Sequence, residues 1–134
     1  MVSVNLLDRY GPVLAMVQAG LCLMAIRFGT IVMNGGSPIT PEIYGPAVYA
    51  FPAIGWAAIQ GTGAFIACYG VLFKRPWVVV IGALPNVALQ AIFSALAGFA
   101  DQGTLLQTGT LLVTLPLCFV TFCAGLQGVR DGRR

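Results

Sequence analysis

The side chains in this sequence that could do chemistry are mostly amides and hydroxyls, and they stand inside long apolar stretches. Asn86 and Gln90 are four residues apart, so a helix would present both amides on one face. In lipid such amides either hydrogen-bond to neighbouring helices, at roughly 0.6–2 kcal/mol per bond, or line a water-accessible path. Both interpretations stay open for six residues, which are Gln18, Gln60, Asn86, Gln90, Thr110 and Thr114.

Arg27 is the one charged residue inside an apolar stretch. On a helix it would lie about 27 Å along the axis from Arg9, at ~1.5 Å per residue, close to the far membrane surface. Its guanidinium can extend to that surface or contact a lipid phosphate. It can also pair with Glu42 or Asp101, the acids of the two loops expected on that side, or hold an anionic ligand. The ion pair would tie the first helix to a loop.

The composition disfavours catalytic, metal and cofactor sites. The sequence has no histidine, and its 4 cysteines form no Cys-x-x-Cys pair. Cys118 and Cys123 would point about 140° apart around a helix, so all four cysteines, with Cys22 and Cys68, are predicted to be free thiols. There is no Ser/His/Asp set and no phosphate-binding glycine loop. We therefore predict that the chain is not an enzyme and binds no metal, haem or other cofactor.

Four long apolar stretches must position these side chains. They run roughly over residues 12–33, 47–73, 77–99 and 105–128, each near or above the ~20 apolar residues that cross a bilayer as a helix. Of the 134 residues, 58% are hydrophobic and 8% are charged, whereas soluble domains carry about 25% charged residues. The sequence predicts an all-α polytopic membrane protein, with residues 1–134 forming a single transmembrane domain.

Positive residues predict the orientation of the chain. They flank the stretches on one side, while the links 34–46 and 100–104 hold no Lys or Arg and one acid each. Because Lys and Arg concentrate in cytoplasmic segments, both termini are expected in the cytoplasm. The net charge of +3 is interpreted as this signal and not as a nucleic-acid interface. The topology anchors are Arg9, Lys74, Arg75, Arg130, Arg133 and Arg134.

Asparagine, glycine and proline mark the expected helix ends. Asn5 or Asp8 is expected to cap the first helix, with Pro12 near its start. This stretch exceeds the 7–15 residues of a signal-peptide core, which favours an uncleaved helix. Asn34 and the glycines after it should close that helix. Residues 44–52 are expected to be kinked or broken at Pro52 before the second span, and the alternative is the start of one long tilted helix.

Short links predict the order of the helices. Lys74, Arg75 and Pro76 form a tight turn, because Pro76 disfavours helical backbone at Arg75, and the 101–103 segment forms another. The simplest arrangement is an up-down-up-down antiparallel bundle. Small residues four apart should let helices approach closely, for packing or for lining a path. These pairs are Ala15/Ala19, Ala57/Gly61, Gly63/Ala67 and Ala91/Ala95.

The layout resembles that of small membrane proteins encoded by tailed phages and proteobacteria, some of which are called holin-like. The resemblance lies in the length, the four spans, the short loops, the basic C-terminal tail and the segment Tyr44-Gly45-Pro46-Ala47-Val48-Tyr49. The size and topology are also similar to those of DoxX-type four-span proteins. The holin-like resemblance implies oligomerisation in the inner membrane and a lesion or channel, for phage release or genome delivery.

Three functions are compatible with the sequence. The first is a small inner-membrane protein that oligomerises to form or gate a membrane pathway. The second is a structural or accessory subunit of a larger membrane or virion assembly. The third is a small-solute carrier that uses Arg27 with Glu42 or Asp101. The expected partners are the lipid bilayer and either further copies of the chain or other membrane proteins, with no nucleic acid.

Overall fold

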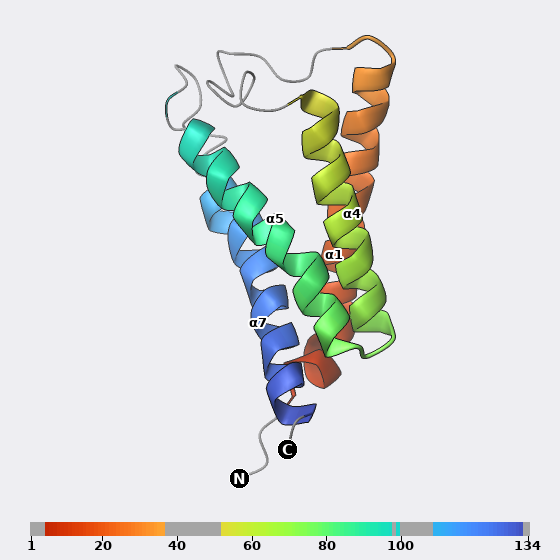
Figure 1. The fold of residues 1–134 in the computed structure, drawn as a ribbon, viewed down its shortest axis with the longest axis vertical. Coiled ribbons are helices and arrows are strands. Elements are labelled where there is room, and N and C mark those ends of the chain that lie inside the picture. The colour runs from red at the N-terminus through yellow and green to blue at the C-terminus, as the bar shows by residue number, and fades with distance from the viewer. Residues whose placement is uncertain (1–4, 37–51, 98, 100–108, 133–134) are drawn as a thin grey trace.

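The computed structural model describes residues 5–36, 52–97, 99 and 109–132 (Figure 1). The regular structure of these residues is helical, and four of their segments are long and apolar enough to cross a membrane. This confirms the all-α prediction with four helices of membrane-spanning length. The elements are α1 (Leu6–Met33), α4 (Ala53–Leu72), α5 (Pro76–Ala97), the π-helical turn η1 (Thr110–Thr114) and α7 (Leu115–Gly132).

Each helix packs mainly against the next helix in the sequence. The extensive interfaces are α1 with α4, α4 with α5, and α5 with α7, whereas α1 and α7 touch over a much smaller area. Helices α4 and α5 run antiparallel, because Gly70 faces Val79 while Gly63, earlier on α4, faces Asn86, later on α5. The start of α1, the end of α7 and the α4–α5 turn lie at one end of the long axis (Figure 1). We call this the terminal end and the other the distal end.

Helix α1 begins at Leu6, after the Asn5 cap that the sequence offered beside Asp8, and so before the apolar stretch 12–33. Asn5 Oδ1 accepts a hydrogen bond from the Leu7 amide at 3.0 Å and caps the helix at Leu6. Pro12 consequently lies inside α1 and not near its first turn. Its ring is exposed on the outside of the bundle. The expectation that placed Pro12 near the helix start was therefore wrong.

The second predicted span begins after Pro52, as expected. Pro52 is the N-cap of α4, and the helix starts at Ala53. Pro76 opens α5 directly after the Lys74–Arg75 turn, which confirms the prediction of a tight turn. The expected break within residues 44–52 falls mostly on residues outside those described, as does the Asp101 turn.

Two helices end in the same hydrogen-bonded motif. At the end of α1 the Gly36 amide donates to Ile31 O at 2.9 Å while Gly35 has φ +83°. At the end of α4 the Arg75 amide donates to Gly70 O at 2.7 Å, and Lys74 has φ +53°. Glycine is the usual residue at this left-handed position. Lys74 occupies it at a backbone cost of roughly 1–2 kcal/mol.

Close backbone approach holds α4 against α5. A Cβ added to Gly82 would meet the Ala67 amide nitrogen, and would lie 2.8 Å from Gly63 O. The predicted Gly63/Ala67 strip is thus a packing surface inside the bundle. Ala57 and Gly61 similarly face α1, where a Cβ on Gly61 would lie 3.2 Å from the Ala25 Cβ. In lipid this kind of contact is a main source of helix association.

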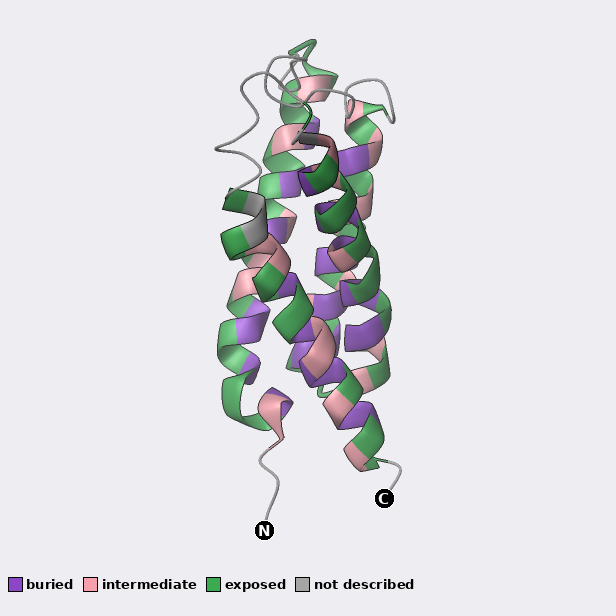
Figure 2. Cartoon of the chain, turned by 90° about the vertical axis from the view of Figure 1, so that its left-hand side faces the viewer, coloured by how far each residue is buried: buried purple, intermediate pink, exposed green. Residues whose placement is uncertain are grey.

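The outside of the bundle is apolar while part of its interior is polar. Met16, Leu23, Phe65 and Leu112 are large apolar side chains that are 65–75% exposed. The exposed residues form the outward faces of all four helices, and the buried residues face inward (Figure 2). Soluble monomers rarely expose such continuous apolar surface. This distribution is the one expected of a multi-pass membrane protein.

Candidate functional site

Gln60 on α4 joins three helices through hydrogen bonds. Its Nε2 donates to Leu21 O of α1 at 3.2 Å, and its Oε1 accepts from Gln90 Nε2 of α5 at 3.4 Å. The backbone oxygen of the same residue accepts from Asn86 Nδ2 at 3.2 Å. The sequence-predicted amides Gln60, Asn86 and Gln90 therefore form one network within a single chain.

The inward face of α5 carries this network. Asn86 and Gln90 are buried on one face of the helix, as the four-residue spacing predicts. Ser94 extends the same face by another four residues and is also buried, although the sequence analysis did not single it out. Gly63 leaves room between α4 and α5 for the Asn86 amide, because a Cβ at residue 63 would lie 3.1 Å from Asn86 Nδ2.

Gln18 of α1 bonds to a residue that the sequence analysis missed. Its Nε2 donates to Thr121 Oγ1 of α7 at 3.1 Å, and the Thr121 hydroxyl donates to Leu117 O at 2.9 Å. Both side chains are fully buried. The sequence did contain a pattern that indicates Thr121. Small and hydroxyl residues recur there at alternating four- and three-residue steps, the spacing of an inward helix face, at Thr114, Cys118, Thr121, Gly125 and Gly128.

Two buried carbonyl oxygens find no hydrogen-bond partner among the described residues. They are Gln18 Oε1 and Asn86 Oδ1, both in side chains with no exposed surface. An unpartnered polar atom in a protein interior costs free energy, about 1–3 kcal/mol, so each such group needs an explanation. A bound water or a polar solute would supply the missing donors.

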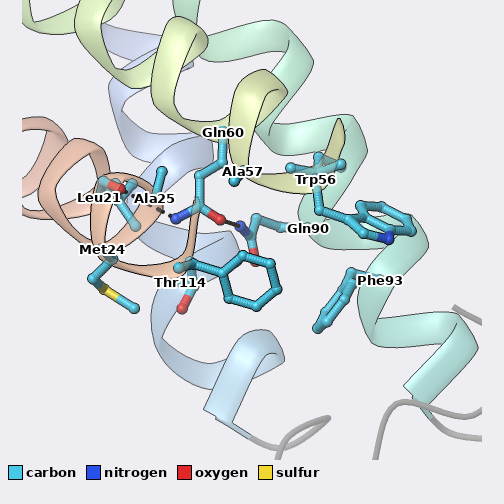
Figure 3. Close-up of a pocket in the computed structure, with 11 residues that line it drawn as sticks. Leu21, Met24, Ala25, Trp56, Ala57, Gln60, Gln90, Phe93 and Thr114 are labelled. Carbon is cyan, nitrogen blue, oxygen red and sulfur yellow. Dashed lines mark hydrogen bonds between the residues drawn. The ribbon is translucent and has the colours of Figure 1, made fainter. Parts of the chain in front are cut away.

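A cavity of about 190 Å³ lies beside the Gln60–Gln90 bond (Figure 3). It is bounded by the later half of α1, the start of α4, the later half of α5 and η1, so it occupies the distal half of the bundle. Figure 3 shows the two amides between Met24 on one side and Trp56 and Phe93 on the other. The lining residues are Leu21, Met24, Ala25, Phe28, Trp56, Ala57, Gln60, Leu89, Gln90, Phe93 and Thr114.

The π-helical turn η1 brings Thr114 to this cavity. Pro116 has no amide to donate to Leu112 O and its ring needs space, which accounts for a widened turn at this point of the helix. Thr114 therefore lines the same cavity as Gln60 and Gln90. Thr110 lies in the same turn, and its side chain is outside the described part of the structure.

The predicted charged site is only partly described. Arg27 is exposed on α1, and its two proposed partners, Glu42 and Asp101, lie outside the described residues. The ion pair that the described residues do show joins Lys74 Nζ to Asp8 at 3.5 Å near the terminal end, with both side chains largely exposed. An exposed pair of this kind contributes about 0–1 kcal/mol.

The other topology anchors gather at the same end. Arg9, Lys74, Arg75 and Arg130 are exposed near the terminal end, and Arg133 and Arg134 lie outside the described residues. Exposed aromatic side chains accompany them, among them Tyr69 and Phe73, whose ring centroids are 4.5 Å apart. Such an aromatic and basic belt is typical of a membrane interface.

The four cysteines are free thiols in the structure. The Cys68 thiol donates to Ala15 O at 3.6 Å, between α4 and α1. Among the described residues, no group of three His, Cys, Asp or Glu side chains could hold a metal ion. The polar chemistry of the described interior is thus carried by amides and hydroxyls.

No protein-family model matches the chain, and no curated protein or solved structure matches it significantly. The holin-like resemblance and the DoxX-type similarity of the sequence therefore stay predictions. The amide network and the cavity beside it are the features of the structure that bear on function.

Proposed function

We propose that this chain is a four-span protein of a bacterial inner membrane, arranged up-down-up-down, with both termini in the cytoplasm. The positions of the charged residues support this orientation. The described positive residues apart from Arg27 lie at the terminal end, and the positive-inside rule assigns that end to the cytoplasm. The distal end, which holds the cavity, then faces the periplasm.

Reporter fusions test this orientation. A green fluorescent protein fused after Arg134 should fluoresce, because it folds in the cytoplasm but not after export in unfolded form. Alkaline phosphatase at the same position should be inactive, since it needs periplasmic disulfide formation. The opposite pair of results would invert the topology.

We propose further that the bundle gates a pathway for small uncharged polar solutes through its own interior. The observation that carries this proposal is the convergence of Gln60, Gln90 and Thr114 on the distal cavity. These groups give a solute hydrogen-bonding partners in place of water. The described cavity lining holds no charged side chain, which favours neutral solutes over ions.

Below the cavity the pathway is closed. The unpartnered oxygens of Asn86 and Gln18 are the next polar atoms towards the terminal end, and a solute could bond to them on its way. Beyond them the interior is filled by Ala67, Val79 and Ala124, none of which has exposed surface. Passage requires the bundle to open, and the seam between α1 and α7, whose contact is limited, is where opening is least opposed.

Glycerol flux into proteoliposomes tests the pathway. Liposomes containing the protein should swell faster in a glycerol gradient than empty liposomes, as measured by stopped-flow light scattering. Gln90→Leu should slow the protein-dependent swelling about tenfold, because losing one hydrogen bond of about 1.4 kcal/mol to the solute raises the barrier by that amount. Ile92→Leu, at an exposed position of the same helix that lines neither the cavity nor the strip described below, should keep the original rate. Equal swelling with and without protein would exclude the pathway.

The predicted oligomer is supported by an exposed strip on α5. The strip consists of the large residues Trp77, Ile81 and Leu84 followed by the small residues Ala88, Ala91 and Ala95. Their alternating four- and three-residue spacing suits packing against another helix in lipid. A second copy of the chain would pack there, as would a larger membrane assembly in the accessory-subunit alternative. Native mass spectrometry of the detergent-extracted protein reads the copy number and any co-purifying chain together.

A further inference from the structure

We infer that the distal cavity is a binding site for an uncharged aromatic molecule that carries one hydrogen-bonding group, such as a phenol. This binding site goes beyond the proposed pathway. A molecule held in the cavity would occupy the distal mouth of the pathway, and it would bind whether or not a solute passes through the bundle. The size, the two-sided lining and the neutrality of the cavity support this site.

The size of the cavity suits a single substituted ring. Its volume is about 190 Å³, and a buried apolar cavity of about 150 Å³ is known to hold benzene. One further substituent therefore fits. A molecule much larger than two fused rings would have to displace the side chains of the lining.

One side of the cavity is aromatic and suited to a ring. Trp56 and Phe93 pack edge to face, with ring centroids 5.3 Å apart and planes at 74°, and Phe28 also lines the cavity. A bound ring can add to this arrangement through the offset and edge-to-face contacts that aromatic groups prefer. Met24 lies on the opposite side (Figure 3), where its thioether can contact the edge of a ring.

The middle of the cavity is polar and suited to one hydroxyl. Among the described residues the Gln90 side chain makes one hydrogen bond, through Nε2 to Gln60 Oε1. Its carbonyl oxygen is thus left to accept a bond from a ligand hydroxyl, and Thr114 also lines the cavity. Because no charged side chain is among the lining residues, an ionised ligand would lose its hydration without compensation.

Fluorescence of a single tryptophan tests the site on the full-length chain in detergent. The chain has 2 tryptophans, so Trp77→Phe leaves Trp56 at the cavity as the only reporter. Trp56→Phe leaves Trp77, which is half-exposed outside the cavity, and its quenching measures partitioning into the micelle. The two probes are 4-bromophenol and 4-bromotoluene, since bromine quenches tryptophan on contact and only the first has a hydroxyl.

Quenching of Trp56 by 4-bromophenol should saturate, whereas quenching of Trp77 should rise linearly. The apparent affinity for 4-bromophenol should exceed that for 4-bromotoluene about tenfold, as expected for one buried hydrogen bond. Gln90→Leu should remove this difference. Linear quenching at Trp56 would overturn the inference, and so would equal affinity for the two probes in the chain with Gln90 intact. Neither result depends on glycerol flux, so the site and the pathway can fail separately.

Discussion

Replacing Gly82 with alanine should destabilise the folded bundle by about 3 kcal/mol, the upper part of the usual range for overpacking. The added Cβ would meet the Ala67 amide nitrogen and lie 2.8 Å from Gly63 O. These are backbone atoms of α4, so they cannot rotate away as a side chain would. The two helices would have to separate along their shared face. That separation removes the close packing that holds helices together in lipid.

Gly20→Ala is the matched control for this substitution. Gly20 lies on the exposed side of α1, and a Cβ there would meet nothing within 4 Å. Alanine should leave the bundle as stable as before, or stabilise it by up to about 1 kcal/mol through its higher helix propensity. Unfolding of both variants in increasing sodium dodecyl sulfate, followed by circular dichroism, measures the difference. Equal midpoints for the two variants would contradict the close approach of α4 and α5.

Thr121→Val should destabilise the bundle by about 1–2 kcal/mol. The substitution removes the oxygen that accepts from Gln18 Nε2 at 3.1 Å. Gln18 is fully buried, and its Oε1 already has no described partner. Its whole amide would then be unbonded in the interior, which costs more than the loss of one hydrogen bond.

The double variant Gln18→Leu with Thr121→Val should be closer to the original stability than Thr121→Val alone. It removes both polar groups together and leaves apolar groups of similar shape, a change that can be nearly neutral. Thr62→Val on the exposed side of α4 is the control for the loss of a threonine hydroxyl, and it should change little. The same denaturant titration measures all three. A double variant at least as unstable as Thr121→Val would show that the Gln18 amide is satisfied by other groups.

The helices were predictable from sequence, while some of their ends were not. Length and hydropathy alone indicate four spans, because a bilayer demands long apolar helices. Asn5 and Asp8 offered competing caps for the first of them, and Pro12 was expected in its first turn. Proline is favoured in a first turn because it lacks an amide proton, yet the Asn5 cap prevailed. An exposed proline ring crowds no other helix, and this exposure could not be known before the packing of α1 was known.

The amide network was predictable in part. The spacing of Asn86 and Gln90 places both on one helix face, and the structure buries both. Their partners depend on how far α4 is displaced along α5, which is determined by the approach of Gly82 to Gly63. The main-chain oxygen of Gln60, which bonds to Asn86, carries no signal in the sequence. Aromatic lining by Trp56 and Phe93 was missed for the same reason, since it arises only when two helices meet.

The large interfaces join helices that are consecutive in the sequence, and this affects how the chain assembles during its synthesis. A ribosome delivers α1, α4, α5 and α7 to the membrane in that order, and each arrives next to the helix that it will pack against. Contacts between neighbours in sequence form quickly, because little chain has to be looped out. The α5–α7 interface and the seam between Gln18 and Thr121 form when the last helix arrives. The N-terminal three helices can therefore assemble while the fourth is still being translated.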